Sequence, residues 1–139
     1  MHDQPRFWRR MFVWAALFNF CFGLPIMFAT EWCYRITFRV PLALDGSMAL
    51  RFWSDFGFAV VLIGVGYYLV SRNLDANHGL VWLGVFAKLF DVTVLTYRYA
   101  IGIARPVVLL PALVDGAFML LFLVFLRQRG GGTFLSPTS

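Results

Sequence analysis

The stretch "VVLLPALVDGAFMLLFLVFL", residues 107–126, contains twenty residues, of which only Asp115 carries a charge. An α-helix rises about 1.5 Å per residue, so a helix of this length covers the hydrocarbon core of a bilayer, which is about 30 Å thick. This stretch therefore predicts a membrane-spanning helix. The fold of the chain depends on whether it contains further membrane-spanning helices that can pack against this one.

Three further stretches have a similar length and are also mainly apolar, and they cover residues 11–30, 52–70 and 80–97. The segments between them are too short for a separate soluble domain. We predict an all-α, integral membrane four-helix bundle with short loops, which forms one domain over residues 1–126. The Gly- and Ser-rich residues 127–139 predict a flexible tail. Pro25 predicts a kink near the far end of the first span.

The composition of the chain supports a membrane as its natural solvent. Of its 139 residues, 60% are hydrophobic and 14% are charged, whereas soluble domains average about 45–50% and about 25%. One small core could not cover so much apolar surface. The net charge of +5 comes from arginines that stand in ones and twos beside apolar runs, which favours lipid headgroups over nucleic acid. We expect the lipid bilayer as partner and no nucleic acid, and a homo-oligomer or larger membrane complex stays open.

The longest connection, residues 31–50, mixes charged and apolar side chains. Over residues 34–40, Thr37 and the two arginines alternate with apolar residues, which is typical of a short strand or an extended segment. Pro41 and the pair Asp45-Gly46 then interrupt the pattern. We predict an amphipathic first extramembrane loop that lies on the membrane surface.

The orientation of the bundle follows from its positively charged residues. The predicted topology places six arginines on the side of the termini, namely Arg6, Arg9, Arg10, Arg72, Arg127 and Arg129. It places five on the other side, namely Arg35, Arg39, Arg51, Arg98 and Arg105. The first span usually dominates the orientation, and here it directly follows a basic cluster. We therefore expect both termini in the cytoplasm. We expect the chain in a bacterial inner membrane.

Five strongly polar residues fall inside the predicted spans: Asn19, Asp55, Lys88, Asp91 and Asp115. A charge at the bilayer centre costs about 2.5–3.5 kcal/mol, so such residues normally face the bundle interior and find partners. Lys88 and Asp115 lie at similar depth in consecutive antiparallel spans, so we expect them to pair. Asp91 lies one helical turn from Lys88 and is a second candidate carboxylate. We predict that all five form a candidate polar cluster.

Small residues recur at helical spacing on two of the spans. They are Ala15, Asn19 and Gly23 in the first span, and Ser54, Gly57, Val61 and Gly64 in the second. Small side chains let helices approach closely in lipid, where packing drives association. We therefore expect these faces to point into the bundle and the phenylalanine-rich faces to point to lipid.

The sequence offers few signals of catalysis, cofactors or metals. Its two histidines, His2 and His78, lie at the terminus and in a loop, which excludes a haem held by two histidines inside the membrane. Cys21 and Cys33 have no CxxC spacing and no neighbouring histidine. We expect no metal and no cofactor, and no catalytic residue can be named.

Three functions remain open. The first is a non-catalytic or accessory membrane protein whose polar cluster sets its fold, and the composition leans toward this class rather than an enzyme. The second is a small proton-coupled or small-molecule transporter. The third is a membrane-embedded enzyme that acts on a lipid or another hydrophobic substrate. A dry, fully paired cluster favours the first, a water-accessible cavity the second, and a cavity that opens to lipid the third.

Overall fold

The computed structural model describes residues 4–42 and 46–129, and all regular secondary structure in these ranges is helical. The elements are α1 (Gln4–Phe28), α2 (Thr30–Thr37), α3 (Gly46–Arg72), α4 (His78–Ala100), the 3-10 helix η1 (Pro106–Val108) and α5 (Leu109–Gln128). In the described ranges, four helices are long and apolar enough to cross a membrane. For these residues, the prediction of an all-α fold with four long apolar helices is confirmed.

The helices extend beyond the apolar runs that predict them. α1 begins at Gln4 rather than at residue 11, and α3 begins at Gly46 rather than at residue 52. Hydropathy marks where the chain could lie in lipid, whereas a helix continues as long as its backbone hydrogen bonds are favourable. At the other end, α5 continues to Gln128. The first residues of the predicted tail are thus helical, Arg129 follows them as the C-cap, and residues 130–139 lie outside the described residues.

The prediction of an extended segment over residues 34–40 is wrong for most of its length. Residues 30–37 form α2, which follows α1 after a single bend at Ala29. The Cys33 N–H donates to the Ala29 carbonyl at 2.9 Å, so this backbone finds its partners locally, where a strand would need a neighbour. α2 is nevertheless amphipathic, because Cys33 is buried while Glu31 and Arg35 are exposed.

A short extended contact follows α2. Phe38 forms an isolated antiparallel bridge with Ala104. The Arg39 N–H donates to the Ile103 carbonyl, and the Arg105 N–H donates to the Thr37 carbonyl, each at 2.8 Å. This contact ties the end of α2 to the connection between α4 and α5.

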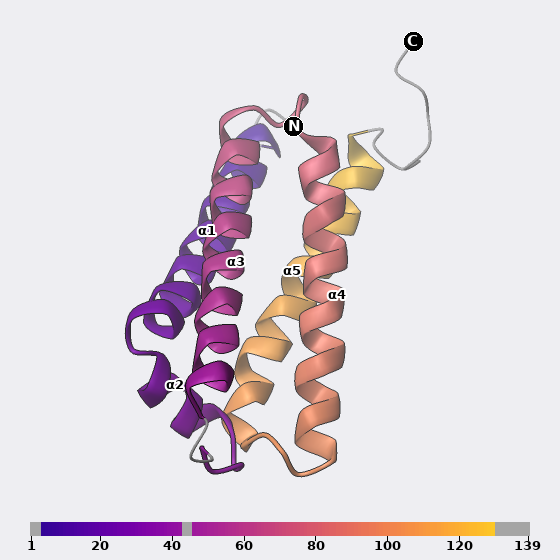
Figure 1. Cartoon of the computed structure of the whole chain (residues 1–139). Helices are drawn as coiled ribbons and strands as arrows, with labels where there is room; N and C mark the ends of the chain where they lie inside the picture. Colours follow the sequence, from indigo (N-terminus) through magenta and orange to yellow (C-terminus); the bar gives the residue numbers. More distant parts are fainter. Residues whose placement is uncertain (1–3, 43–45, 130–139) are drawn as a thin grey trace.

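The long helices form two pairs, one made by α1 with α3 and one made by α4 with α5 (Figure 1). In the first pair the backbones touch at glycines: a Cβ on Gly23 would lie 2.8 Å from the Gly57 oxygen, and a Cβ on Gly57 would lie 2.9 Å from the Gly23 oxygen. The small-residue faces predicted for these two helices are therefore confirmed as their contact surface.

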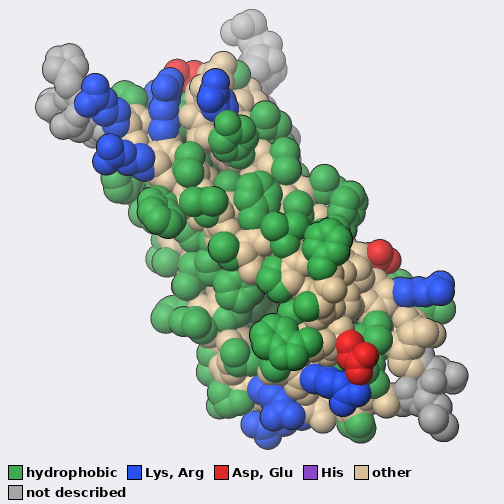
Figure 2. Space-filling view, turned by 90° about the vertical axis from the view of Figure 1, so that its left-hand side faces the viewer, with side chains coloured by type: hydrophobic (Ala, Val, Ile, Leu, Met, Phe, Trp, Pro, Cys, Tyr) green, Lys and Arg blue, Asp and Glu red, His purple; other side chains and the backbone are tan. Residues whose placement is uncertain are grey.

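The charges separate from the apolar surface along the bundle. α1 begins and α5 ends at the same end of the bundle (Figure 1). On the face shown in Figure 2, Lys and Arg side chains gather toward the two ends and hydrophobic side chains cover the length between them. This distribution is what a membrane environment requires.

The end of the bundle that holds the start of α1 is filled by aromatic rings, and we call it the closed half. Its buried rings are Trp8, Phe12, Tyr67, Phe122 and Phe125. Phe12 of α1 stacks on Phe122 of α5 with ring centres 5.1 Å apart and meets Phe125 edge-on at 5.0 Å. These rings join the two helix pairs.

Candidate functional site

A buried ionic cluster lies between the two helix pairs, and it consists of Asn19, Lys88 and Asp115. The Lys88 ammonium donates hydrogen bonds to the Asp115 carboxylate and, at 2.8 Å, to the Asn19 side-chain oxygen. The Asn19 amide donates to the Val60 carbonyl at 3.1 Å. The three residues are at most 4% exposed. The cluster thus connects α4 to α5 and α1 through Lys88, and α1 to α3 through Asn19.

Aromatic rings complete the surroundings of the Lys88 ammonium. Its nitrogen lies 5.3 Å from the ring centre of Phe18 and 5.6 Å from that of Tyr67, within the range of a cation–π interaction. Gly84, one turn before Lys88, makes room for this, because a Cβ there would lie 2.6 Å from the Tyr67 ring. The sequence therefore places a glycine where the tyrosine ring must pass.

Asp91 lies beside the cluster but does not join it. It is half-buried, and the Lys88 ammonium is bonded to the other carboxylate. Within residues 4–42 and 46–129, no side chain or backbone group donates a hydrogen bond to Asp91. The sequence predicted two carboxylates for one lysine, and the structure leaves one of them without a bonded cation.

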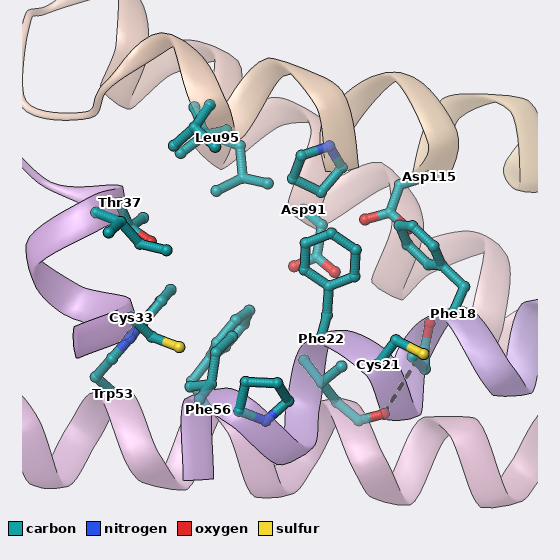
Figure 3. Close-up of a pocket in the computed structure, with 18 of the residues that line it drawn as sticks. Phe18, Cys21, Phe22, Cys33, Thr37, Trp53, Phe56, Asp91, Leu95 and Asp115 are labelled. Atoms are coloured by element: carbon teal, nitrogen blue, oxygen red, sulfur yellow. Dashed lines mark hydrogen bonds between the residues drawn. The ribbon is translucent and has the colours of Figure 1, made fainter. Parts of the chain in front are cut away.

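Asp91 and Asp115 point into a cavity of about 360 Å³ between the helix pairs, which we call cavity A (Figure 3). Its polar end is formed by the ionic cluster and Asp91. Its remaining wall is mostly apolar, with aromatic rings contributed by Phe18, Phe22, Trp32, Trp53 and Phe56. Cavity A therefore combines an apolar body with one charged end.

A second cavity of about 460 Å³, cavity B, lies against α3 and α4 and reaches the connection after α4. Arg98 lines it, with its guanidinium 5.7 Å from the ring centre of Phe38. Four residues line both cavities: Trp53, Phe56, Asp91 and Leu95. Asp91 is thus accessible from two sides.

The half of the bundle with these cavities, which we call the open half, contains further polar groups. The buried indole N–H of Trp53 has no hydrogen-bond acceptor in the part of the chain that the structure describes. Cys21 and Cys33 line cavity A as free thiols. Burial raises the pKa of the Cys33 thiol above its ordinary value, so it is a weak nucleophile at neutral pH.

Asp55 corrects the prediction that all five polar residues line the interior. Asp55 is exposed on α3 and borders neither cavity. Its neighbours explain this, because Ser54 donates to the Met27 carbonyl at 3.4 Å and Gly57 contacts Gly23. The face of α3 that meets α1 thus passes beside Asp55, which is turned away from it.

The aromatic wall of cavity A is the part of the site that sequence reasoning missed. Trp53, Phe56 and Val60 recur at helical spacing along α3 and all line the cavity. This spacing shows that the three side chains share one face of α3. Aromatic residues in an apolar helix are otherwise interpreted as lipid-facing, and spacing alone does not separate a lipid face from a cavity face.

No metal site is evident, since in the described ranges no three His, Cys, Asp or Glu side chains come together to hold an ion. No family model, curated protein or solved structure matches this chain. Its function must be argued from the ionic cluster and cavity A.

Proposed function

We propose that the chain is an integral membrane protein with a non-catalytic role, which holds a hydrophobic molecule in cavity A. Four helices long and apolar enough to span a membrane support its location, as do the charges gathered at the ends of the bundle (Figure 2). We infer a bacterial inner membrane with both termini in the cytoplasm, because the basic cluster Arg6, Arg9 and Arg10 directly precedes the first span, which usually dominates the orientation.

Cavity A is the observation that carries the binding role. Its volume of about 360 Å³ lies within the range of small-molecule sites, roughly 300–1,000 Å³. Such sites are mostly apolar with a few placed polar groups, and cavity A has this composition. The ionic cluster supports the role by holding four helices in place around one end of the cavity.

The location is tested with reporter fusions at the two termini. A fluorescent protein that matures in the cytoplasm is expected to be bright at both the N- and the C-terminus, and alkaline phosphatase is expected to be inactive at both. An active phosphatase at either terminus contradicts the proposed orientation. Extraction of the chain by alkaline carbonate contradicts its integration in the membrane.

The binding role is tested with pyrene, a neutral hydrophobic probe, and the purified full chain. Energy transfer to pyrene from the tryptophans, of which Trp32 and Trp53 line cavity A, is expected to saturate. Cys21→Phe narrows the cavity and is expected to reduce this transfer severalfold. Leu24→Phe is the matched control, because Leu24 is exposed on α1 and is not part of the cavity wall. Equal transfer in both variants contradicts binding in cavity A.

A small-molecule carrier is the second candidate function. It is favoured by the four residues that cavities A and B share, because a ligand held at Asp91 borders both cavities. A carrier exchanges its cargo across the membrane, whereas a binding protein does not. Release of a labelled hydrophobic cargo from proteoliposomes at a rate above that of empty liposomes would support the carrier, and equal rates would exclude it.

A further inference from the structure

The charges in the wall of cavity A do not balance. One ammonium, that of Lys88, faces two carboxylates, those of Asp91 and Asp115. The Lys88 ammonium is bonded to Asp115 and Asn19, so its charge is already directed to one acid. Among the residues that the structure describes, no arginine lines cavity A. The cavity therefore offers a ligand one carboxylate that lacks a bonded cation.

The aromatic wall of the cavity suits a positive charge as well. The faces of aromatic rings carry negative potential and attract cations, and cages of several rings recognise quaternary ammonium groups. Phe18 shows this within the molecule, since its ring lies 5.3 Å from the Lys88 ammonium. The rings of Phe22, Trp53 and Phe56 line the same cavity and extend this surface past Asp91 (Figure 3).

We propose, building on the binding role above, that cavity A takes a hydrophobic organic cation, such as a protonated or quaternary amine, with Asp91 as its counterion. Away from water, a lone carboxylate and a lone cation are each costly, and their contact offsets part of both desolvation costs. An anionic ligand would face Asp91 with like charge. A neutral ligand would fill the apolar body of the cavity and leave Asp91 unpaired.

Two probes of matched shape and opposite charge test the proposal on the purified full chain. Tetraphenylphosphonium is a permanent cation and tetraphenylborate a permanent anion, so binding does not depend on protonation of the probe. Equilibrium dialysis in dodecyl maltoside, with protein-free micelles as blank, measures both. We expect saturable binding of the cation and no saturable binding of the anion.

Variants then locate the charge that the cation meets. Asp91→Asn keeps the shape of the side chain and is expected to weaken cation binding about tenfold or more, because it removes the opposite charge from the partly buried surroundings of the cation. Asp91→Glu keeps the charge and is expected to retain binding. Asp55→Asn is the matched control, because it removes one negative charge from the exposed surface of α3, and it is expected to leave binding unchanged.

Several results would overturn the proposal. They are equal binding of the two probes, no saturable binding of the cation, or full cation binding by a folded Asp91→Asn. If Asp91→Asn does not fold, the comparison of the two probes on the unaltered chain decides. If the cation fails while pyrene binding still responds to Cys21→Phe, the charge preference is wrong and the binding role stands. If both probes of cavity A fail, both proposals fall.

Discussion

The closed half and the open half of the bundle are both rich in aromatic rings, but the rings have different partners. In the closed half they meet across the helix pairs, as Phe12 of α1 does with Phe122 of α5. In the open half Trp53 stacks on Phe56, its neighbour on α3, with ring centres 5.2 Å apart, and meets Phe38 edge-on at 5.0 Å. The contact of Phe18 with Phe118 between the helix pairs is longer there, at 5.9 Å. Close ring contacts between the helix pairs therefore go together with the filled half of the bundle, and ring contacts within one pair go together with the cavities.

The ionic cluster lies where the two halves meet. Removing one of its charges is expected to cause the largest loss of stability among the changes considered. Lys88→Met leaves Asp115 buried and without a cation, which we expect to lower the free energy of unfolding by about 3–5 kcal/mol. Asp115→Leu leaves Lys88 in the same condition. The double variant removes both charges and is expected to recover most of the loss. Denaturant unfolding in detergent measures all three, and additive losses would show that the pair is not a clamp.

Removing one ring from each half compares their packing directly. Phe122 is fully buried in the closed half, so Phe122→Ala leaves a void and is expected to cost about 3 kcal/mol, at the lower end for large-to-small core changes. Phe56 borders both cavities, so Phe56→Ala enlarges existing space and is expected to cost less than about 1 kcal/mol. Thermal unfolding of the two variants gives the comparison. Equal losses would mean that the open half is packed as tightly as the closed half.

The glycine contact between α1 and α3 sets the distance between these two helices in the open half. A Cβ at Gly57 would lie 2.7 Å from the Ile26 side chain and 2.9 Å from the Gly23 oxygen. We expect Gly57→Ala to force the helices apart and to cost about 1–3 kcal/mol, as overpacking does. Gly66 on the same helix is the control, because a Cβ there would meet nothing within 4 Å. A cost for Gly66→Ala equal to that for Gly57→Ala would assign the effect to the helix and not to the contact.

The smallest expected loss of stability concerns the ion pair between the end of α5 and the connection from α3 to α4, at the tip of the closed half. Arg129 pairs with Asp75 at 2.7 Å, and the Asp75 side chain is 76% exposed. Exposed pairs contribute about 0–1 kcal/mol, so Asp75→Asn is expected to cost about 0.5 kcal/mol or less. Raised salt should remove the difference, because exposed charges are screened. A loss that persists at high salt would show that this end of the bundle depends on the pair.

Part of the site could be predicted because depth along a helix is additive. Counting residues from the ends of two antiparallel spans placed Lys88 opposite Asp115, and the structure brings them together. Asn19 could be placed in the interior because it shares a face with small residues. Its hydrogen bond to Lys88 could not be predicted, because it joins α1 and α4, which belong to different helix pairs. Asp55 and Asp91 show the limit of counting residues. Asp55 lies next to the contact face of α3 in the sequence, and this offset of one position is enough to expose its side chain. Asp91 lies at a suitable depth, but Lys88 is already bonded to Asp115.

The long apolar helices, their approximate positions and the faces on which α1 and α3 touch could be predicted from the amino-acid sequence. These follow from local properties, namely the apolar length that a bilayer requires and the spacing of small residues along one helix. Three features are visible in the folded bundle alone: the helices form two pairs, rings fill one half and leave cavity A in the other, and Asp91 has no bonded cation among the described residues. Those features depend on how side chains from several helices pack into one interior volume, which the pattern along a single helix does not show.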